Sequence, residues 1–504
     1  MMIPRTMISA ISAAVAVCLF PVLSMAAEVG HSGYAIVVEE AIYNDADWKK
    51  VCDALITKHP GATVIQWNTK LEESLPSLRK VHPRYTCFVA PCTKVGPGFV
   101  AQVHRLTRQY DDDIYTDTQW GIVTGYDAKT ALSLVNTSQP ITIKRVSSGT
   151  EIAMEMVDQA ICYDELVANK TVQKLAGAKE GKQGRCPTDT TQLLADTLTD
   201  WKADLFITSG HGFKRGWQIG FRYKNGFFNS DDGQLFGKDL TGKRFKITSD
   251  HRRVYLPIGN CSIGCVEDKN AFAIAMMKTA GVKGMIGYTV PTWYGYAGWG
   301  CLDYFVEQPS RYTLNEAFLA NQHALVHRLE TSFPGAMKKN PAPGKQDRSA
   351  VKLTKEGAAL GVKSNDAAGL LHDRDVLAYY GDPALVARMD KRSCAYDQVL
   401  VKEGDTYTLT VIGRRGKDTF KPINTNGSQR GGRPIVQFFP ERMRGLKKVE
   451  IVSGSEWLPV ITDDFILVPN PGNGKGEGNG KGEELKVKFR VVISPAISPA
   501  ERAR

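Results

Sequence analysis

The feature that most constrains the fold is an alternation of short apolar runs with helix-periodic segments, which begins at Tyr34. Residues 34–38 (YAIVV) predict a buried strand, and apolar residues then recur at helical spacing until His59-Pro60-Gly61 ends the helix. Residues 62–67 (ATVIQW) predict a second strand. A strand, a helix and a strand in this order favour a mostly parallel sheet flanked by helices, so we expect an α/β fold.

The N-terminus has the pattern of an export signal. One charge, Arg5, precedes an apolar run over residues 7–23, and small residues follow at 24–27. This pattern predicts a signal peptide over residues 1–27, and therefore a secreted or periplasmic protein. A membrane anchor is the alternative, but the run is short for a bilayer span and is broken by Pro21. No later run is long enough to span a membrane, so we expect no transmembrane segment in the mature chain.

Charge and cysteine content narrow the function classes. The formal net charge is +11, but the basic residues are spread along the chain, which favours a solvated surface over nucleic-acid binding. The chain has ten cysteines, and loss of Cys18 with the signal peptide leaves an odd number. An exported protein normally pairs its thiols, so one thiol is expected to stay free. None of the cysteine spacings is typical of a zinc site.

The chain divides into three regions after the signal peptide. We expect an N-terminal α/β subdomain over residues 28–145 and a catalytic subdomain over 146–390. Residues 151–168 predict a helix within the second region. From residue 391 to 504, alternating stretches at 406–412, 435–439, 448–452 and 486–493 predict antiparallel strands of an immunoglobulin-like β-sandwich. The low-complexity residues 470–484 predict a loop between the last strands.

Two strand ends carry the candidate chemistry. An apolar run at residues 205–208 ends in 209–212 (SGHG), which contains His211 and Gly212, and a run at 254–258 ends at Cys261. In a parallel sheet, functional groups gather at the carboxyl ends of adjacent strands. A thiolate needs a nearby base, and histidine suits that role. We therefore predict Cys261 as a nucleophile with His211 as its base, and the amides of Gly212 and Cys261 as an oxyanion hole.

Other assignments stay open at this point. A core cysteine and a loop histidine would be the ordinary alternative to a catalytic pair. Cys265 is a rival nucleophile, but Cys261 follows the predicted strand directly. The residue that orients His211 is not fixed by the sequence, and Glu151 and Asp204 are both possible.

An acidic cluster precedes a third glycine-ended strand. Asp111, Asp112, Asp113 and Asp117 lie in a turn-like stretch, and adjacent carboxylates of this kind bind calcium in some proteins and form solvated loops in others. We expect no cofactor to be required by a cysteine–histidine pair, and a structural calcium ion at these four residues is the one metal site that the sequence suggests.

The motifs together resemble a known family. A strand that ends in His211-Gly212, followed by a strand that ends in Cys261, is similar to the caspase-like fold of clan CD cysteine peptidases. The closer resemblance is to the gingipain-like family, because residues 112–117 (DDIYTD), Trp293-Tyr294 and 381–383 (GDP) are similar to its motifs and a β-sandwich follows. The chain departs from the family at Tyr126, where gingipain-like proteins usually have arginine. It also lacks the caspase motif around the cysteine.

The resemblance implies an activity and a substrate. It implies a secreted cysteine endopeptidase that hydrolyses protein or peptide substrates through an acyl-enzyme on Cys261. Thr289, Trp293 and Tyr294 would bind the substrate side chain that precedes the scissile bond. Two alternatives remain: a catalytically silent surface or binding protein with the same fold, and an amidase or transpeptidase that uses the same dyad.

Overall fold

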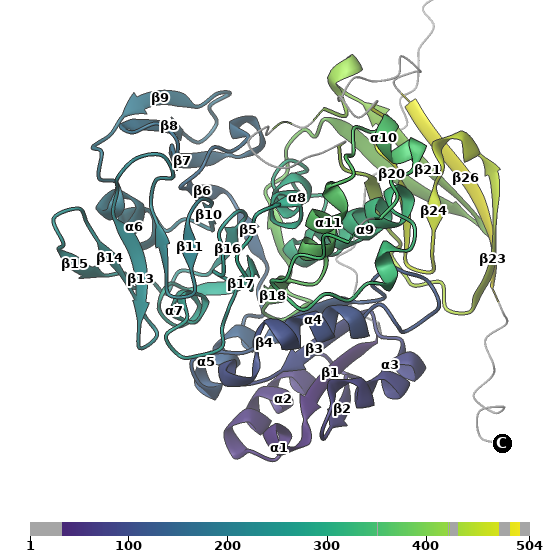
Figure 1. The fold of residues 1–504 in the computed structure, drawn as a ribbon, viewed down its shortest axis with the longest axis horizontal. Helices are drawn as coiled ribbons and strands as arrows, with labels where there is room; N and C mark the ends of the chain where they lie inside the picture. The colour runs from purple at the N-terminus through teal and green to yellow at the C-terminus, as the bar shows by residue number, and fades with distance from the viewer. Residues whose placement is uncertain (1–32, 350, 422, 424–431, 473–483, 494–504) are drawn as a thin grey trace, which may run out of the picture.

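A twelve-stranded sheet forms the centre of the protein (Figure 1). The computed structural model describes residues 33–349, 351–421, 423, 432–472 and 484–493, so the predicted signal peptide and most of residues 470–484 lie outside it. Helices flank this sheet, and the α/β prediction is confirmed. The strands, in spatial order, are β2 (Thr63–Trp67), β1 (Tyr34–Glu39), β3 (Tyr85–Val89), β4 (Gln119–Val123), β18 (Leu377–Tyr380), β17 (Val282–Tyr288), β16 (Arg253–Pro257), β10 (Leu205–Thr208), β6 (Arg145–Ser148), β7 (Gln159–Tyr163), β8 (Lys170–Lys174) and β9 (Lys182–Arg185).

The direction of the strands changes near the middle of the sheet, and it alternates again at the far end, where β8 is antiparallel to both β7 and β9. Strands from β2 to β18 are parallel to one another, as are strands from β17 to β7, but β17 and β18 are antiparallel. The amino ends of the first set therefore lie at the same edge as the carboxyl ends of the second. The predicted boundary at residue 145 falls where the chain passes from one set to the other, and it stays a prediction.

Sequence signals for helix ends are visible in the two longest helices. Asp45 accepts hydrogen bonds from two amides at the start of α2, and Thr313 with Glu316 forms a capping box at the start of α9. Within the described residues, no helix is both long and apolar enough to cross a bilayer. The α-helices are α1 (Glu40–Tyr43), α2 (Ala46–Lys58), α3 (Leu75–Val81), α4 (Pro97–Leu106), α5 (Ala128–Val135), α6 (Thr191–Thr199), α7 (Phe272–Thr279), α8 (Tyr296–Phe305), α9 (Leu314–Ser332), α10 (Lys355–Ala359) and α11 (Asp366–Arg374).

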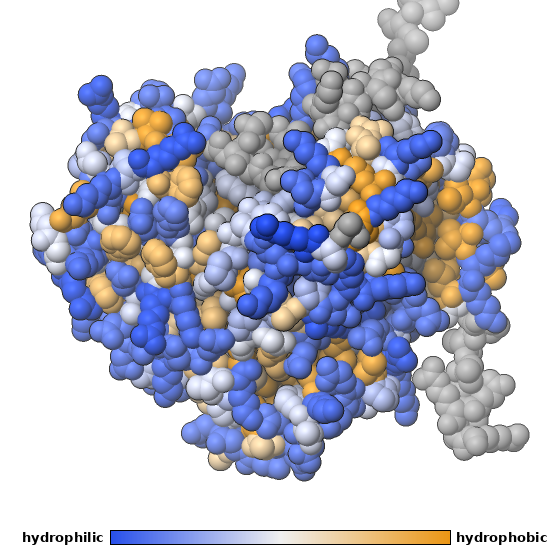
Figure 2. Space-filling model, viewed as in Figure 1, coloured by the Kyte–Doolittle hydropathy of each residue, from blue (hydrophilic) through white to orange (hydrophobic). Residues whose placement is uncertain are grey.

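Antiparallel strands follow the helical region, as predicted for a β-sandwich. Buried and exposed residues alternate along β26, which is the pattern of a strand with one face on a core. Figure 2 shows apolar side chains gathered on the visible face over these strands. One sheet contains β20 (Tyr396–Glu403), β21 (Thr406–Gly413), β26 (Glu484–Ile493) and β23 (Leu446–Ser453), and the other contains β22 (Ile435–Phe438), β25 (Phe465–Val468) and β24 (Val460–Ile461).

Two smaller sheets complete the described strands. The chain between the His211 and Cys261 strands forms a five-stranded antiparallel sheet, and a short parallel pair lies elsewhere. The five strands are β11 (Gly212–Phe213), β12 (Gly216–Gln218), β13 (Phe227–Asp231), β14 (Gln234–Lys238) and β15 (Arg244–Lys246), and the pair is β5 (Ile141–Ile143) with β19 (Ala387–Met389).

The helix predicted over residues 151–168 is wrong. This segment contains a single 3₁₀ turn, Met154–Met156, and then strand β7. β7 is paired on both sides within the sheet. Residues 160–163 (AICY) of β7 form a short continuous apolar run, and such a run does not distinguish strand from helix by periodicity.

Asp382, in the 381–383 motif, joins the start of the sheet to α2. Its buried carboxylate accepts hydrogen bonds from the Tyr34 hydroxyl at 2.9 Å and from His59 Nε2 and Lys58 Nζ at 2.8 Å each. Burial alone would raise the pKa of Asp382, but the hydrogen bond from His59 and the charge of Lys58 hold that pKa well below its usual range. The motif therefore has a structural role here.

Candidate functional site

The strands that precede His211 and Cys261 are neighbours in the sheet. β10 and β16 pair in parallel, with Thr208 opposite Pro257, and the Ile258 amide donates to the Thr208 carbonyl at 2.9 Å. Their carboxyl ends therefore leave the sheet side by side. The structure brings the His211 and Cys261 segments together at one edge of the sheet.

Asn260 ties the two segments to each other. Its buried side chain accepts a hydrogen bond from the Thr208 hydroxyl at 2.6 Å and donates to the Gly210 carbonyl at 3.2 Å. Sequence reasoning gave no functional role to Asn260. Its position directly before Cys261, after a buried strand, was the available signal.

Gly212 lies against the backbone of the cysteine segment. A Cβ atom at this position would be 2.8 Å from the Cys261 carbonyl oxygen, 2.8 Å from Asn260 Cβ and 2.9 Å from Ile263 Cγ1. Real Cβ atoms do not approach neighbours this closely, so only glycine fits. The close contact fixes the His211 segment directly beside Cys261.

The thiol and the imidazole are both accessible but do not contact each other. Cys261 is half-buried, and its Sγ donates to the Thr292 carbonyl at 3.4 Å. His211 is exposed, and its ring packs on Phe221 with 4.8 Å between centroids. In the described part of the chain, no hydrogen bond joins the Cys261 and His211 side chains. Such bonds are often long or absent until substrate binds.

The backbone around Cys261 leaves amide donors without an acceptor. Ser262 adopts a left-handed conformation with φ of 56°, and its amide donates to the Val290 carbonyl at 3.1 Å. Among the described residues, none accepts a hydrogen bond from the Cys261 amide. The Gly212 amide faces away from β12. The Gln218 amide donates to the His211 carbonyl at 3.0 Å, so Gly212 and Trp217 form a non-hydrogen-bonded pair in the hairpin. Both amides are therefore available as donors.

Glu165 is a functional candidate that sequence reasoning missed. Its buried carboxylate accepts hydrogen bonds from the Ser209 hydroxyl and from the Thr150 hydroxyl, the latter at 2.8 Å, and its carbonyl accepts from the Phe221 amide at 2.6 Å. Burial raises its pKa. Glu165 therefore holds the segment before His211 and also the backbone of Phe221, whose ring packs on His211.

The two residues proposed from sequence to orient His211 lie elsewhere. Asp204 is at the amino end of β10, opposite the end that carries His211, and its carboxylate contacts His251 Nε2 at 2.8 Å. Glu151 is exposed and lies in the loop after β6. Glu165 lies two residues after the end of β7, so it has the same strand-end position as His211 and Cys261. This position was hidden because the segment was predicted as a helix.

Cys265 is poorly placed to act as a nucleophile. It is buried, and burial together with the Glu267 carboxylate raises the pKa of Cys265 to about 11. A thiol with that pKa is almost entirely protonated at neutral pH. All nine cysteines of the described residues are free thiols.

The loop after β17 carries the three residues predicted to bind substrate. Trp293 is exposed, but Thr289 and Tyr294 are buried. The Thr289 hydroxyl donates to the Val376 carbonyl at 2.9 Å. Thr289 and Tyr294 therefore support the loop, while Trp293 is the one of the three whose side chain is exposed to solvent.

Side chains of α11 form hydrogen bonds with the same loop and with the residues on either side of it. His372 Nε2 lies 3.1 Å from the Pro291 carbonyl, and Asp373 accepts from the Ala297 amide at 3.0 Å and from the Tyr288 hydroxyl at 3.1 Å. These contacts fix both ends of the segment whose Thr292 carbonyl contacts Cys261. Sequence reasoning gave no role to either residue.

Three of the four acidic residues predicted to bind calcium lie together. Carboxylate oxygens of Asp111, Asp113 and Asp117 lie within 4.8 Å of one another, whereas Asp112 is exposed outside this group. Burial and the charges of Asp111 and Asp113 raise the pKa of Asp117 well above its usual value. Several close carboxylates fit a hard cation such as calcium, but Arg442 also donates to the Asp117 carbonyl. Calcium binding stays a prediction.

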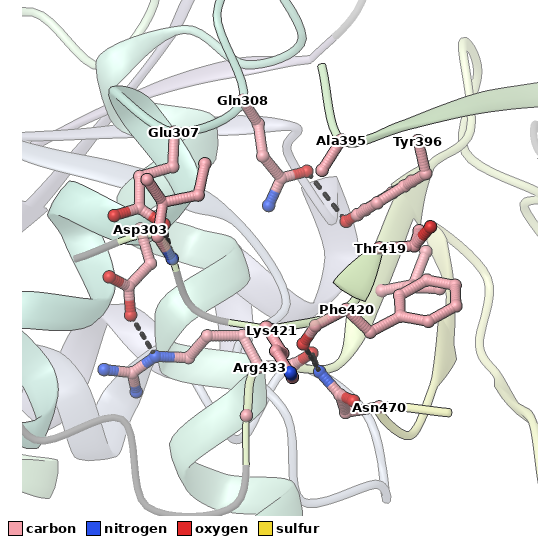
Figure 3. Close-up of a pocket in the computed structure, with 13 residues that line it drawn as sticks. Asp303, Glu307, Gln308, Ala395, Tyr396, Thr419, Phe420, Lys421, Arg433 and Asn470 are labelled. Carbon is pink, nitrogen blue, oxygen red and sulfur yellow. Dashed lines mark hydrogen bonds and ion pairs between the residues drawn. The ribbon is translucent and has the colours of Figure 1, made fainter. Parts of the chain in front are cut away.

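Two cavities lie away from these strand ends. A small one of about 60 Å³ separates α8 from the C-terminal strands, where Arg433 pairs with Asp303 at 2.7 Å and the Tyr396 hydroxyl donates to Gln308 at 2.9 Å (Figure 3). A larger cleft of about 1040 Å³ includes Tyr34 and Tyr85, at the amino ends of β1 and β3. Neither is lined by His211 or Cys261.

Comparisons with known proteins give one distant similarity. No protein-family model matches the chain, and no curated protein does. A solved structure described as a complex of Porphyromonas gingivalis RgpB pro- and mature domains is similar over 88% of this chain and 94% of that chain, with a TM-score of 0.42 and 11% identity. The similarity is too distant to assign the chain to a family, so the functional argument depends on the site itself.

Proposed function

We propose that this protein is an exported cysteine endopeptidase in which Cys261 is the nucleophile and His211 the general acid and base. The observation that carries the proposal is the contact between the two strand ends, where Gly212 packs on the Cys261 carbonyl. A half-buried thiol, an exposed imidazole and two amides without acceptors then lie at one edge of the sheet. This combination supports acyl transfer through a thioester.

The reaction begins when the thiol turns from the Thr292 carbonyl and gives its proton to His211. Cys261 Sγ attacks the peptide carbonyl carbon, and the developing oxyanion accepts hydrogen bonds from the amides of Gly212 and Cys261. His211 then protonates the leaving amine as the C–N bond breaks. A water molecule, deprotonated by His211, attacks the thioester and releases the acid with the free thiol.

A silent binding protein of the same fold is the alternative that one observation favours. The thiol contacts the Thr292 carbonyl rather than His211. The two functions differ in whether this contact is released, because its release lets the thiol turn toward His211.

Labelling with a peptidyl electrophile tests the nucleophile. We expect covalent modification of the wild type at Cys261, none for Cys261→Ala, and a rate for His211→Ala that is lower by about 10²-fold or more. Cys265→Ala is the matched control, because its buried thiol should leave the rate unchanged. Equal labelling of the wild type and Cys261→Ala would reject the assignment.

A further inference from the structure

Three exposed aromatic side chains lie in the segments that follow β10 and β17, the two strands on either side of β16. Phe213, Phe221 and Trp293 are 51%, 44% and 47% exposed. Every other phenylalanine, tryptophan and tyrosine of the described residues is buried or half-buried. A single exposed apolar residue is ordinary, but three exposed aromatic residues beside one site indicate a binding surface.

Their positions place them on both sides of the thiol. Phe213 directly follows Gly212, and Phe221 packs on the ring of His211. Trp293 lies on the other side, because it follows Thr292, whose carbonyl contacts Cys261 Sγ. A peptide that passes over Cys261 therefore meets an aromatic ring before and after the reacting carbonyl.

Acidic groups near the site are already paired. Glu165 is engaged by the hydroxyls of Ser209 and Thr150. Glu267 pairs with Lys214 at 2.6 Å, and Asp268 lies 3.4 Å from Lys214 and from Arg215. A basic substrate side chain would have to break one of these pairs, whereas an apolar side chain would cover the exposed rings.

We propose that the site selects peptides with bulky apolar side chains on both sides of the scissile bond. Trp293 contacts the residue that contributes the carbonyl, because it adjoins the thiol on the side away from His211. Phe221 contacts the residue that contributes the amine, because His211 must reach that nitrogen. This inference rests on the proposed endopeptidase function and adds the substrate class.

Two matched series of internally quenched peptides test the selection. One series varies the residue before the bond among Phe, Leu, Ala, Arg and Glu, and the other varies the residue after it, in a background of small residues. We expect kcat/KM for Phe and Leu to exceed that for Ala, Arg and Glu by about tenfold or more in both series, which is the range that apolar pockets supply.

Substitutions assign the two subsites. Trp293→Ala should reduce the Phe-to-Ala ratio only in the first series, and Phe221→Ala only in the second. Phe221 also packs on His211, so its loss can lower kcat/KM for every peptide. The Phe-to-Ala ratio of kcat/KM is therefore the readout, because a uniform loss of activity leaves that ratio unchanged. Leu240→Ala, an exposed residue in the turn between β14 and β15, is the control and should alter neither ratio.

The outcomes separate this inference from the function on which it rests. Cleavage with the highest kcat/KM for Arg would overturn the apolar selection and leave the endopeptidase standing. Ratios that neither Trp293→Ala nor Phe221→Ala changes would overturn the assigned subsites. If no peptide is cleaved although iodoacetamide alkylates Cys261, the endopeptidase itself fails, and the inference fails with it.

Discussion

Replacing Gly212 by alanine tests whether the two strand ends are held in contact. The new Cβ would lie 2.8 Å from the Cys261 carbonyl oxygen and 2.8 Å from Asn260 Cβ, so backbone atoms would have to move by several tenths of an ångström. The backbone of Gly212 is not in the left-handed region. The cost is therefore steric, about 1–3 kcal/mol of unfolding free energy for an overpacked site.

The effect on chemistry should be larger than the effect on stability. A displacement of about 1 Å between reacting groups can reduce a rate by about 10²-fold. We expect Gly212→Ala to lower the rate constant for labelling of Cys261 by that order while the protein still folds. Urea unfolding and the labelling time course measure the two quantities on the same samples.

Gly98 provides the matched control. It lies near the start of α4, and a Cβ there would meet no atom within 4 Å. Gly98→Ala should leave labelling unchanged and stabilise the protein by up to about 1 kcal/mol. If Gly212→Ala is labelled at the wild-type rate and is as stable as the wild type, the two strand ends are not held in the close contact described.

Three further predictions concern other buried side chains. Asn260→Ala should cost about 1–3 kcal/mol in urea unfolding, because it leaves the buried Thr208 hydroxyl and Gly210 carbonyl short of a partner, and an unchanged midpoint would contradict this. Burial raises the pKa of Asp373 to about 7, above about 3.9 when unfolded, so this group stabilises the fold at low pH and the contribution is lost as pH rises from about 4 to 7. Across that pH window, the unfolding free energy of Asp373→Asn should therefore rise relative to that of the wild type by up to about 1.4 kcal/mol per pH unit. Parallel curves of unfolding free energy against pH for the two proteins would contradict the assignment. Calcium at a hundredfold excess over its Kd should stabilise the wild type by about 2.7 kcal/mol but not Asp117→Asn, and equal thermal shifts in both proteins would exclude the site.

The sequence predicts the fold class well because its signals are local. Apolar runs and turn residues indicate the strands that end near His211 and Cys261, and alternation along residues 486–493 indicates the C-terminal sheets. Both signals come from residues close together in the chain. They require no knowledge of which strands pair.

The parts that sequence reasoning missed depend on pairing between distant segments. β7 was predicted as a helix, because its short continuous apolar run does not distinguish a strand from a helix, and Glu165 was missed with it. The antiparallel contact between β17 and β18, which brings His372 and Asp373 beneath the loop of Thr292, joins residues far apart in sequence. Tertiary contacts of this kind leave no local pattern.

Hydrolysis of peptide bonds decides whether Cys261 is the nucleophile of an endopeptidase. The measurement is the appearance of new peptide termini, read by mass spectrometry, when purified protein is incubated with a proteome-derived peptide mixture. We expect cleavage by the wild type and by Cys265→Ala at similar rates, and a loss of about 10³-fold or more for Cys261→Ala. Cleavage by Cys261→Ala at the wild-type rate, or none by a wild type whose Cys261 is readily labelled, would contradict this expectation.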